Sequence, residues 1–259
     1  MKTLKETILA KEKIVGTHVQ LSDPAICEIV GRLGYDYIWV DLEHTYMSYK
    51  DLLCHISAAH NAGTPVIVRV PQNDFTVTKK VMEMGPDGII FPMITSVEQA
   101  KALIDYTVYP PYGNRGFGPM GAVGYGYYDT DEYLGDGHLN KTCRFIQIEH
   151  KAAVDCLDEL AKIDHIDGYI FGPFDLSGSV NKIGQVKDPE VVGLMKHTVK
   201  VLHDAGKYVG LSIGAHDEEN LKFWSDLGID MLSSHSDHAS IFESLRETLT
   251  ILNKVHKNR

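Results

Sequence analysis

The sequence has few cysteines, and they are not spaced as a metal or redox motif. There are 4 cysteines in 259 residues, with no C-x-x-C pair among them. They are Cys27, Cys54, Cys143 and Cys156, and each falls in a segment that we expect to be helix or strand. We therefore expect buried thiols rather than disulfides or zinc ligands, and a reducing compartment.

The sequence also lacks a basic surface and a long apolar run. Lys and Arg number 25 against 35 Asp and Glu, which gives a formal net charge of −10. No basic stripe is present, which argues against nucleic acid or an anionic membrane as a partner. The opening residues, MKTLKETILAKEK, contain no apolar signal core, and no stretch approaches membrane-spanning length. These absences predict a cytoplasmic protein.

What the sequence does contain is a repeated alternation of apolar strands with helices. A chain of 259 residues that are 44% hydrophobic can bury one large core. Strands are predicted at 13–19, 37–40, 64–70, 88–92, 145–148, 168–171, 208–212 and 231–234. Helix N-cap signals between them include Asp23-Pro24, Ser48 and Asp188. The pattern predicts a single (β/α)₈ barrel domain over residues 1–259, with a doubly wound open sheet as the alternative.

Some segments lie outside this alternation. Leu4 and Ile8 predict a short amphipathic helix at the start of the chain. After Tyr109, roughly thirty residues rich in Gly, Tyr and Pro contain one expected helix near Glu132, and loops of that length are usually lids or interfaces. Residues 241–255 predict an amphipathic closing helix.

The stretch from Cys143 to Ser177 presents a carboxylate after each of two strands. Glu149 closes the first strand, Asp175 follows the second through Gly-Pro-Phe, and residues 153–163 between them have helical spacing. Such a βαβ unit has parallel strands, so both acids lie at one rim, where α/β folds bind ligands. Two neighbouring carboxylates suit a hard divalent ion such as Mg²⁺ or Mn²⁺. The alternative is a pair of solvated loop acids.

Other strand ends add an acid, a base and an amide to the same rim. The residues are Asp41, Glu43 and His44 after the second strand, Arg69 at the end of the third, and Gln147 in the fifth. Taken alone, His44 is compatible with a structural hydrogen bond and Arg69 with a surface ion pair. In a barrel, their common position at the strand ends predicts a catalytic rim.

Two further motifs compete with this interpretation. The stretch from Gly116 to Gly121 matches G-x-G-x-x-G but follows no strand, so we do not expect dinucleotide binding. His235 and His238 follow the last strand and suggest a metal site. A helix N-cap at Ser236 or Asp237 is the preferred interpretation of that cluster.

Six strings resemble the HpcH/HpaI class II pyruvate aldolases of the phosphoenolpyruvate/pyruvate barrel superfamily. In order, they are YDYIWVDLEHT, PVIVRVPQND, GIIFPMITSVEQA, YPPYGNRGFGP, FIQIEH and IDGYIFGPFDLS. The similarity covers about residues 13–250. It implies a (β/α)₈ barrel, usually a hexamer built as a trimer of dimers that exchange the closing helix. It also implies cleavage or formation of 4-hydroxy-2-oxo acids through a pyruvate enolate, with a 2-oxo acid and an aldehyde as ligands.

The resemblance implies a role for the residues at the rim. Glu149 and Asp175 match the ligands of a divalent ion, Mg²⁺ or Mn²⁺, with Co²⁺ or Zn²⁺ as alternatives. Arg69 matches the group that binds the pyruvate keto oxygen. His44 matches the catalytic base, and Asp41 matches the residue that orients it.

Further residues are assigned by the same resemblance. Gln147 would line the pyruvate pocket, together with the backbone around Gly172, Pro173 and Phe174. Glu83 matches an acid that completes the histidine network, often from a neighbouring subunit. These residues complete the site that the family likeness implies.

The chemistry of pyruvate agrees with those roles. Its methyl protons are weakly acidic, so enolate formation needs positive charge beside the oxygen that becomes negative, which a divalent ion and Arg69 would supply. Cleavage also needs a base for the 4-hydroxyl, and an imidazole with an ordinary pKa of about 6.5 suits that task at neutral pH. This is the role expected of His44, with Asp41 fixing its tautomer.

The sequence departs from the family at two places. Residues 119–126 contain no basic side chain where relatives often carry an Arg, and Leu42 replaces a small residue. Both changes argue against a dicarboxylate substrate and favour a neutral or aromatic aldehyde. The alternatives are another carbon–carbon lyase of the superfamily, acting on acyl-CoA or phosphoenolpyruvate-type substrates, and a catalytically silent binding protein. Coenzyme A would need a basic strip, and none is present.

Overall fold

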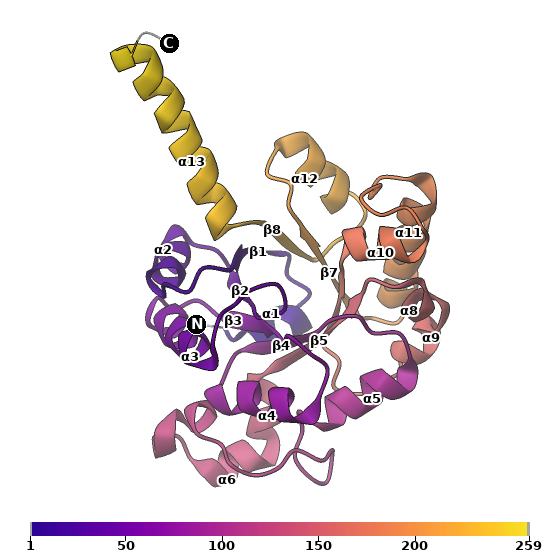
Figure 1. Cartoon of the computed structure of the whole chain (residues 1–259). Coiled ribbons are helices and arrows are strands. Elements are labelled where there is room, and N and C mark those ends of the chain that lie inside the picture. Colours follow the sequence, from indigo (N-terminus) through magenta and orange to yellow (C-terminus); the bar gives the residue numbers. More distant parts are fainter. Residues whose placement is uncertain (1, 258–259) are drawn as a thin grey trace.

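Eight apolar segments pair in chain order to form a closed barrel of parallel strands (Figure 1). A computed structural model describes residues 2–257, while Met1, Asn258 and Arg259 lie outside the described residues. The strands are β1 (Ile14–Val19), β2 (Tyr37–Asp41), β3 (Val66–Arg69), β4 (Gly88–Phe91), β5 (Cys143–Ile148), β6 (Gly168–Phe171), β7 (Tyr208–Ile213) and β8 (Met231–Ser236). Because β8 also pairs with β1, the predicted (β/α)₈ barrel is confirmed.

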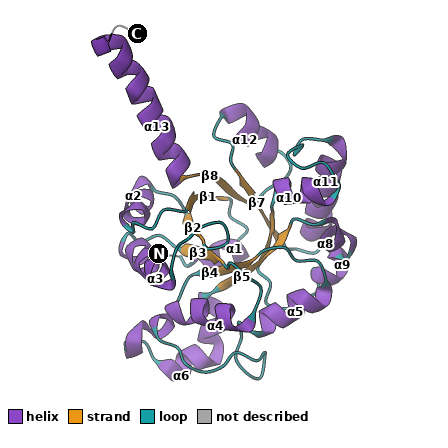
Figure 2. Ribbon diagram, in the orientation of Figure 1, coloured by secondary structure: helices purple, strands orange, loops and turns teal. Residues whose placement is uncertain are grey.

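Helices surround this ring of strands (Figure 2). They are α1 (Leu4–Leu9), α2 (Ala25–Leu33), α3 (Tyr49–Asn61), α4 (Phe75–Met84), α5 (Val97–Asp105), α6 (Thr130–Glu132), α7 (His138–Lys141), α8 (Lys151–Asp155), α9 (Leu157–Leu160), α10 (Pro173–Ser179), α11 (Pro189–Asp204), α12 (Glu218–Ser225) and α13 (Asp237–Leu252). Further helical turns are η1 (Gly121–Gly126), η2 (Tyr133–Gly137) and η3 (Asn253–Lys257). Among residues 2–257, no helix combines the length and the hydrophobicity that a membrane crossing requires.

Local sequence signals explain where several helices begin and end. The Ser48 and Asp74 side chains accept hydrogen bonds from the backbone N–H groups of the first turns of α3 and α4. Ser96 does the same for α5 by accepting from the Gln99 N–H, while the Gln99 side chain accepts a hydrogen bond from the Thr95 N–H. Gly34 ends α2 with a φ of 93°, a conformation that glycine adopts without strain.

Alternate residues of each strand face two different cores. The inner core fills the barrel, and its strand residues include Trp39, Ile67, Ile90, Phe145 and Ile170. Leu4 and Ile8 of α1 join the same cluster, where they pack with residues from the starts of strands. The predicted opening helix therefore closes the end of the barrel opposite the carboxyl ends of the strands. The carboxyl ends are the side on which barrels of this kind carry their sites.

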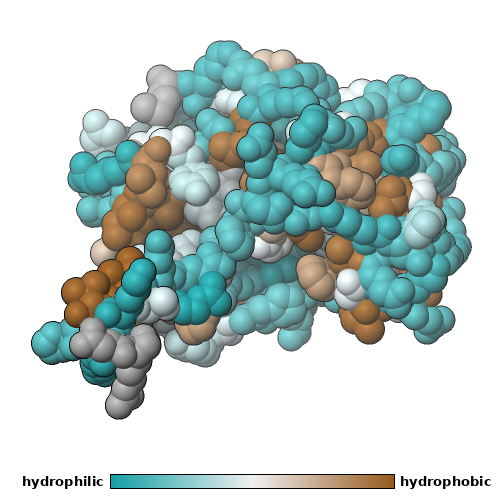
Figure 3. Space-filling model, turned by 90° about the horizontal axis from the view of Figure 1, so that it is seen from above, coloured by the Kyte–Doolittle hydropathy of each residue, from teal (hydrophilic) through white to brown (hydrophobic). Residues whose placement is uncertain are grey.

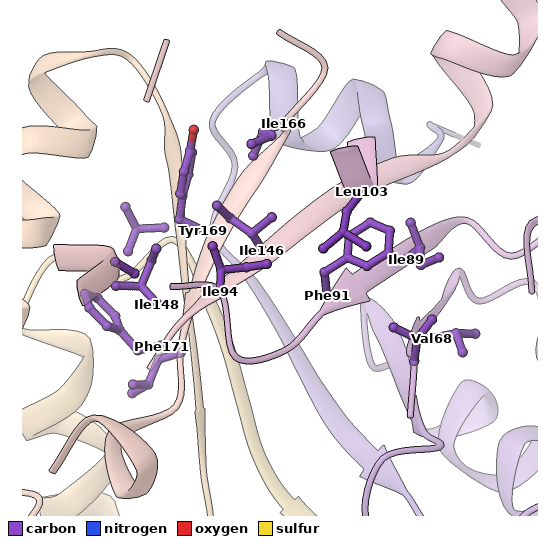
Figure 4. Packing of buried hydrophobic residues seen from close by; sticks show 14 of the residues in the cluster. Val68, Ile89, Phe91, Ile94, Leu103, Ile146, Ile148, Ile166, Tyr169 and Phe171 are labelled. Atoms are coloured by element: carbon purple, nitrogen blue, oxygen red, sulfur yellow. The ribbon is translucent and has the colours of Figure 1, made fainter. Parts of the chain in front are cut away.

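The outer core lies between the strands and the surrounding helices (Figure 4). Ile89 and Phe91 point outward from β4, and Leu103 of α5 lies beside Phe91. Ile146 and Ile148 of β5 face the same outer layer. Burial on both faces accounts for the near-continuous apolar runs of these strands.

The structure differs from the predicted elements in two helices and in the long segment after Tyr109. The helix expected over 153–163 is two short helices, α8 and α9, because Cys156 leaves the helical conformation with φ −114° and ψ 21°. The periodicity marked the buried face of each piece but not the break between them. The closing helix starts at Asp237 rather than 241, and it ends at Leu252. The long segment after Tyr109 contains α6, α7, η1 and η2 rather than a single helix.

The cysteines differ in burial. Cys27 and Cys143 are buried as expected, and Cys156 is partly buried. Cys54 is exposed, so the expectation of burial is wrong for it. The reason is its position in α3, where Leu52 and Ile56 face the core instead. All four are free thiols.

The closing helix α13 stands away from the barrel (Figure 1). Its exposed apolar side chains recur at helical spacing and include Ile241, Phe242, Leu245, Leu249 and Leu252. Figure 3 shows apolar surface along this projecting arm. An apolar stripe of this kind is typical of a surface that another protein surface covers.

Candidate functional site

Side-chain alternation directs four of the predicted residues into the mouth of the barrel. Trp39 and Ile67 face the inner core, so Asp41 and Arg69, each two positions further along its strand, also face inward at the carboxyl ends. Phe145 of β5 sets the same direction for Gln147 and Glu149 two and four positions later. The rim anticipated from strand ends is therefore present.

Asp41 and Arg69 form a buried, two-pronged ion pair. Arg69 Nε donates to Asp41 Oδ1 at 3.0 Å, and Nη2 donates to Oδ2 at 2.6 Å. Burial alone would raise the pKa of Asp41, but the hydrogen bonds and the charge of Arg69 hold it below its usual value. Gln20 Nε2 also donates to Asp41 Oδ2 at 3.1 Å. The pair therefore keeps its charges and fixes the plane of the guanidinium group.

Arg69 also faces Glu43. Its Nη1 lies 3.0 Å from Glu43 Oε2, and its guanidinium carbon lies 5.4 Å from the centre of the Trp39 ring. Burial tends to lower the pKa of Arg69, but the hydrogen bond to Asp41 and the charges of Asp41 and Glu43 raise it. Arg69 is therefore a permanent positive charge at the mouth, held from two sides.

Glu149 is buried at the end of β5 and anchored at both oxygens. The Met93 N–H donates to Oε1 at 2.6 Å, and Gln147 Nε2 donates to Oε2 at 2.8 Å. Gln147 Oε1 is buried and has no hydrogen-bond partner in the described chain. That oxygen is free to accept a hydrogen bond from water or from a ligand.

Several charges converge on Glu149. Burial raises the pKa of its carboxyl to about 7, and the nearby charges of Asp175 and Glu43 act in the same direction. The Met93 N–H and Arg69 oppose this shift without cancelling it. A carboxylate buried next to other carboxylates is stabilised when a cation binds between them. Glu149 and Asp175 therefore fit a divalent ion with oxygen ligands and open positions.

Gly172 makes room for the Glu149 carboxylate. A Cβ added at Gly172 would lie 2.2 Å from Glu149 Oε2, which is a steric clash. Gly172 is also the residue before α10, and Pro173 occupies the first turn of that helix. Asp175 follows in the same turn and is exposed. The Gly-Pro-Phe-Asp turn therefore provides both the space for one acid and the backbone position of the other.

Arg69, Asp41 and Phe174 line one cavity of about 430 Å³ at the mouth. His18 and Gln20 also line it, and neither was predicted as a site residue from the sequence. His18 follows Ile14 and Gly16 of β1 on the inward face, so the same alternation would have identified it.

His18 is a fixed, neutral part of this wall. Burial lowers its pKa to about 4, so at neutral pH it carries no charge. Its Nδ1 donates to the His235 carbonyl oxygen at 2.6 Å, while its Nε2 lies 2.9 Å from Ser212 Oγ and 3.2 Å from Ser233 Oγ. These contacts join β1 to β7 and β8 below the mouth.

His44 lies at the outer edge of the mouth, with its side chain 61% exposed. Its Nε2 is 3.7 Å from Glu43 Oε2. Asp41 reaches His44 through the backbone N–H, at 3.4 Å from Oδ1, and its carboxylate is otherwise bonded to Arg69, Gln20 and the Glu43 N–H. Within one chain, Asp41 thus orients Arg69, and its predicted role toward the imidazole stays a prediction.

Glu83 lies away from the mouth. It is in α4, where its Oε1 accepts a hydrogen bond at 3.1 Å from Nη2 of the buried Arg115. Glu83 and Met120 line a separate apolar cavity of about 680 Å³. Leu42 is also directed elsewhere, because its side chain packs in the outer core. The single chain therefore does not bring Glu83, Leu42 or this part of the loop segment 119–126 into the Arg69 cavity.

Comparisons with known proteins point to one family. The HpcH/HpaI aldolase/citrate lyase family model matches residues 15–234. A hydroxypyruvate/pyruvate aldolase from Pseudomonas aeruginosa is 30% identical over 244 residues, covering 94% of this chain and 90% of the relative. A 2-keto-3-deoxy-L-rhamnonate aldolase from Escherichia coli (strain K12) is 29% identical over 213 residues, covering 82% and 79%. The crystal structure of an HpcH/HpaI aldolase from Desulfitobacterium hafniense DCB-2 is similar with a TM-score of 0.90, at 27% identity over 98% of both chains.

Proposed function

The chain belongs to the HpcH/HpaI aldolase/citrate lyase family, and we propose that it is a divalent-metal-dependent aldolase acting on 4-hydroxy-2-oxo acids. The products of cleavage are then pyruvate, or a close 2-oxo acid, and an aldehyde. Relatives named for hydroxypyruvate, pyruvate and 2-keto-3-deoxy-L-rhamnonate support a 2-oxo acid as the common ligand.

One observation carries the proposal. Arg69 and Asp175 both act on the buried carboxylate of Glu149 at the open end of the barrel, where the charge of Asp175 raises its pKa and that of Arg69 lowers it. If the two acids hold a hard cation, that cation and the guanidinium of Arg69 present two positive groups to one anionic ligand. A 2-oxo acid presents a carboxylate and a ketone oxygen on adjacent carbons, which matches such a pair of charges.

Glu149 and Asp175 would hold the ion, preferably Mg²⁺ or Mn²⁺, with Co²⁺ or Zn²⁺ as alternatives. When bound, the ion supplies positive charge that stabilises the developing enolate oxygen. Arg69 would face the same oxygen, and its ion pair with Asp41 prevents it from rotating away. Gln147 would accept a hydrogen bond with its unpaired Oε1.

His44 would act as the base for the 4-hydroxyl proton during cleavage. It lies at the solvent edge beside Glu43, so a proton taken there can leave to water. In the direction of synthesis, the imidazolium would return the proton to the new hydroxyl. General base catalysis of this kind contributes about 10²- to 10⁴-fold in rate.

The chain would work as a homo-oligomer, as a hexamer built from dimers. The exposed apolar stripe of α13 supports a partner subunit that covers this helix, and exchange of α13 between subunits would achieve this. Glu83 and Met120 line a cavity away from their own mouth, which supports a contribution to the site of a neighbour. The absence of a basic residue in the loop segment 119–126 favours a neutral or aromatic aldehyde.

The proposal is tested by measuring pyruvate release from a 4-hydroxy-2-oxo acid with lactate dehydrogenase as the coupling enzyme. EDTA should abolish release, and added Mg²⁺ or Mn²⁺ should restore it. Asp175→Ala should remain inactive with either metal, because one of the two ion ligands is gone.

Asp158→Ala is the matched control, since Asp158 also lies in the first turn of a short helix but outside the mouth. That variant should retain wild-type release. Pyruvate release that persists in EDTA, or in Asp175→Ala, would show that the metal mechanism is wrong. If release depends on the metal as expected, a panel of aldehydes offered with pyruvate would identify the second substrate.

A further inference from the structure

Two histidines and a glutamate meet at the edge of the mouth, apart from the carboxylates described above. His216 follows β7, His235 lies near the end of β8, and Glu243 lies in α13. Glu243 Oε2 is 3.3 Å from His235 Nε2 and 3.7 Å from His216 Nε2. One possible ligand atom from each residue lies within 4.8 Å of the other two. Three elements that are separate in the chain thus present one donor set.

Hydrogen bonding does not account for this arrangement. No hydrogen bond joins Glu243 to either imidazole in the described chain, and its carboxylate is at ion-pair distance from both rings, where an imidazole carries a charge only when it is protonated. A separation of 3.7 Å is also longer than an N–H···O hydrogen bond, which is usually about 2.9–3.0 Å. The two rings lie 4.8 Å apart at an angle of 42°, so they are not stacked in parallel either.

The separations suit a small ion. Zinc lies about 2.0–2.1 Å from histidine nitrogen and carboxylate oxygen, which places tetrahedral ligand atoms about 3.3–3.4 Å apart. The distance from Glu243 to His235 already has this value. His216 is 57% exposed in its side chain and follows β7, so it can close the remaining gap by a small movement.

The backbone at His235 supports a specific use of its side chain. His235 has a φ of 61°, in the left-handed region that glycine adopts without strain. The hydrogen bond from His18 Nδ1 to the His235 carbonyl, at 2.6 Å, holds the residue in this conformation. A side chain kept at a strained position is typical of a functional site.

We propose that His216, His235 and Glu243 bind a transition-metal ion of the Zn²⁺ class at a second site. Two imidazoles with one carboxylate suit Zn²⁺ and its neighbours, whereas the all-oxygen pair of Glu149 and Asp175 suits Mg²⁺ or Mn²⁺. The two sites therefore differ in ligand chemistry as well as in position.

The second site lies where two cavities meet. One is the cavity of about 430 Å³ that Arg69 lines, and the other, of about 610 Å³, is lined by Arg246 and Glu247 of α13. Three protein ligands leave a fourth position for water or for a group that enters from either cavity. Because Glu243 belongs to α13, the ion also fixes the direction in which this helix leaves the barrel.

Equilibrium dialysis of tag-free protein against Zn²⁺, in excess Mg²⁺, tests the proposal. The wild type should retain a single Zn²⁺ that Mg²⁺ does not displace. His216→Gln, Glu243→Gln and His235→Gly should each bind Zn²⁺ more weakly than the wild type. The loss should exceed about 10- to 100-fold, which is the usual cost of removing a residue that only hydrogen-bonds to a metal ligand. Glycine suits the left-handed backbone of His235, so His235→Gly should fold, and circular dichroism without metal checks this.

Two controls separate this site from others. His197→Gln, which removes an exposed histidine of α11, should keep the ion. The double variant Glu149→Gln with Asp175→Asn should keep it as well, because its ligands lie elsewhere. Substituting Co²⁺ should give the visible absorption of a nitrogen-containing site of low coordination number in the same variants that retain Zn²⁺.

The proposal is overturned if the wild type retains no Zn²⁺. It is also overturned if the Glu149 and Asp175 double variant loses the ion, or if all three variants of the proposed ligands keep it. The readout is ion retention, not pyruvate release, so a negative result leaves the proposed aldolase function untouched.

Discussion

Asp41 and Arg69 are register partners on β2 and β3, and their side chains form two hydrogen bonds across the pair of strands. The main-chain ladder of the sheet thus sets the distance between carboxylate and guanidinium. A planar guanidinium bonded at two atoms cannot rotate, so its remaining N–H groups keep a fixed direction. The pairing of β2 with β3 therefore determines where the positive charge of Arg69 lies at the mouth.

Arg69→Lys should reduce kcat/KM for pyruvate release by about 10²- to 10³-fold, the usual cost of losing one donor to a developing negative charge. Lysine keeps the charge but cannot make both bonds to Asp41 with a planar group. Steady-state kinetics checks the prediction. Arg32→Lys on the exposed surface of α2 is the control and should leave kcat/KM unchanged. If the Arg69→Lys enzyme is as active as the control, the role proposed for the guanidinium of Arg69 is wrong.

Gly172→Ala should impair metal binding while leaving the barrel folded. The added Cβ would lie 2.2 Å from Glu149 Oε2, so the carboxylate must move from its hydrogen bond with Gln147. Isothermal titration with Mn²⁺ measures the loss of affinity. Gly193→Ala is the control, because a Cβ added at Gly193 of α11 meets no atom within 4 Å. This variant should bind Mn²⁺ normally, and its free energy of unfolding should rise by about 1 kcal/mol. Equal Mn²⁺ affinity in both variants would refute the steric argument.

The metal-free protein should lose stability as pH rises through the titration of Glu149. Its folded pKa is about 7 against an ordinary value of 4.5, so the folded state binds the extra proton between these limits. Below pH 4.5 both states hold the proton, and above pH 7 the destabilisation is complete. Glu149→Gln should therefore be more stable than the wild type at pH 8 by up to about 3 kcal/mol, with a much smaller difference near pH 4.5.

Urea unfolding in EDTA at both pH values measures this difference. Other titrating groups are common to the two proteins and cancel in the comparison. Glu219→Gln, at an exposed acid of α12, is the control and should show no such dependence on pH. A difference between Glu149→Gln and the wild type that does not change with pH would show that Glu149 ionises normally.

Charges placed on the apolar stripe of α13 should dissociate the oligomer. The double variant Leu245→Glu with Leu249→Glu places two charges four positions apart on this stripe. If a partner subunit covers the stripe, both carboxylates would be buried without a cation partner, which is unfavourable. Light scattering coupled to size-exclusion chromatography should show smaller particles than for the wild type. Thr250→Glu, on a different face of the helix by its spacing, should assemble normally. A monomeric wild type, or a double variant of unchanged mass, would contradict the proposed subunit contact.

The sequence by itself determined the barrel and the open end that carries the site. Strand alternation, N-cap residues and strand ends are local properties, because each depends on neighbours along the chain. They are sufficient to place Asp41, Arg69 and Glu149 at one rim of the barrel. His18 could have been placed in the same way from its alternation with Ile14.

Tertiary structure alone decided which of these groups touch. The carboxylate of Asp41 bonds Arg69 rather than the ring of His44, since the register of β2 against β3 places Arg69 opposite it. Glu83 pairs with Arg115, a residue 32 positions away whose approach no local pattern indicates. His216, His235 and Glu243 likewise meet because closing the barrel sets the relative positions of β7, β8 and α13. Local sequence specifies the direction of a side chain, while contacts between distant elements depend on how the whole ring of strands closes.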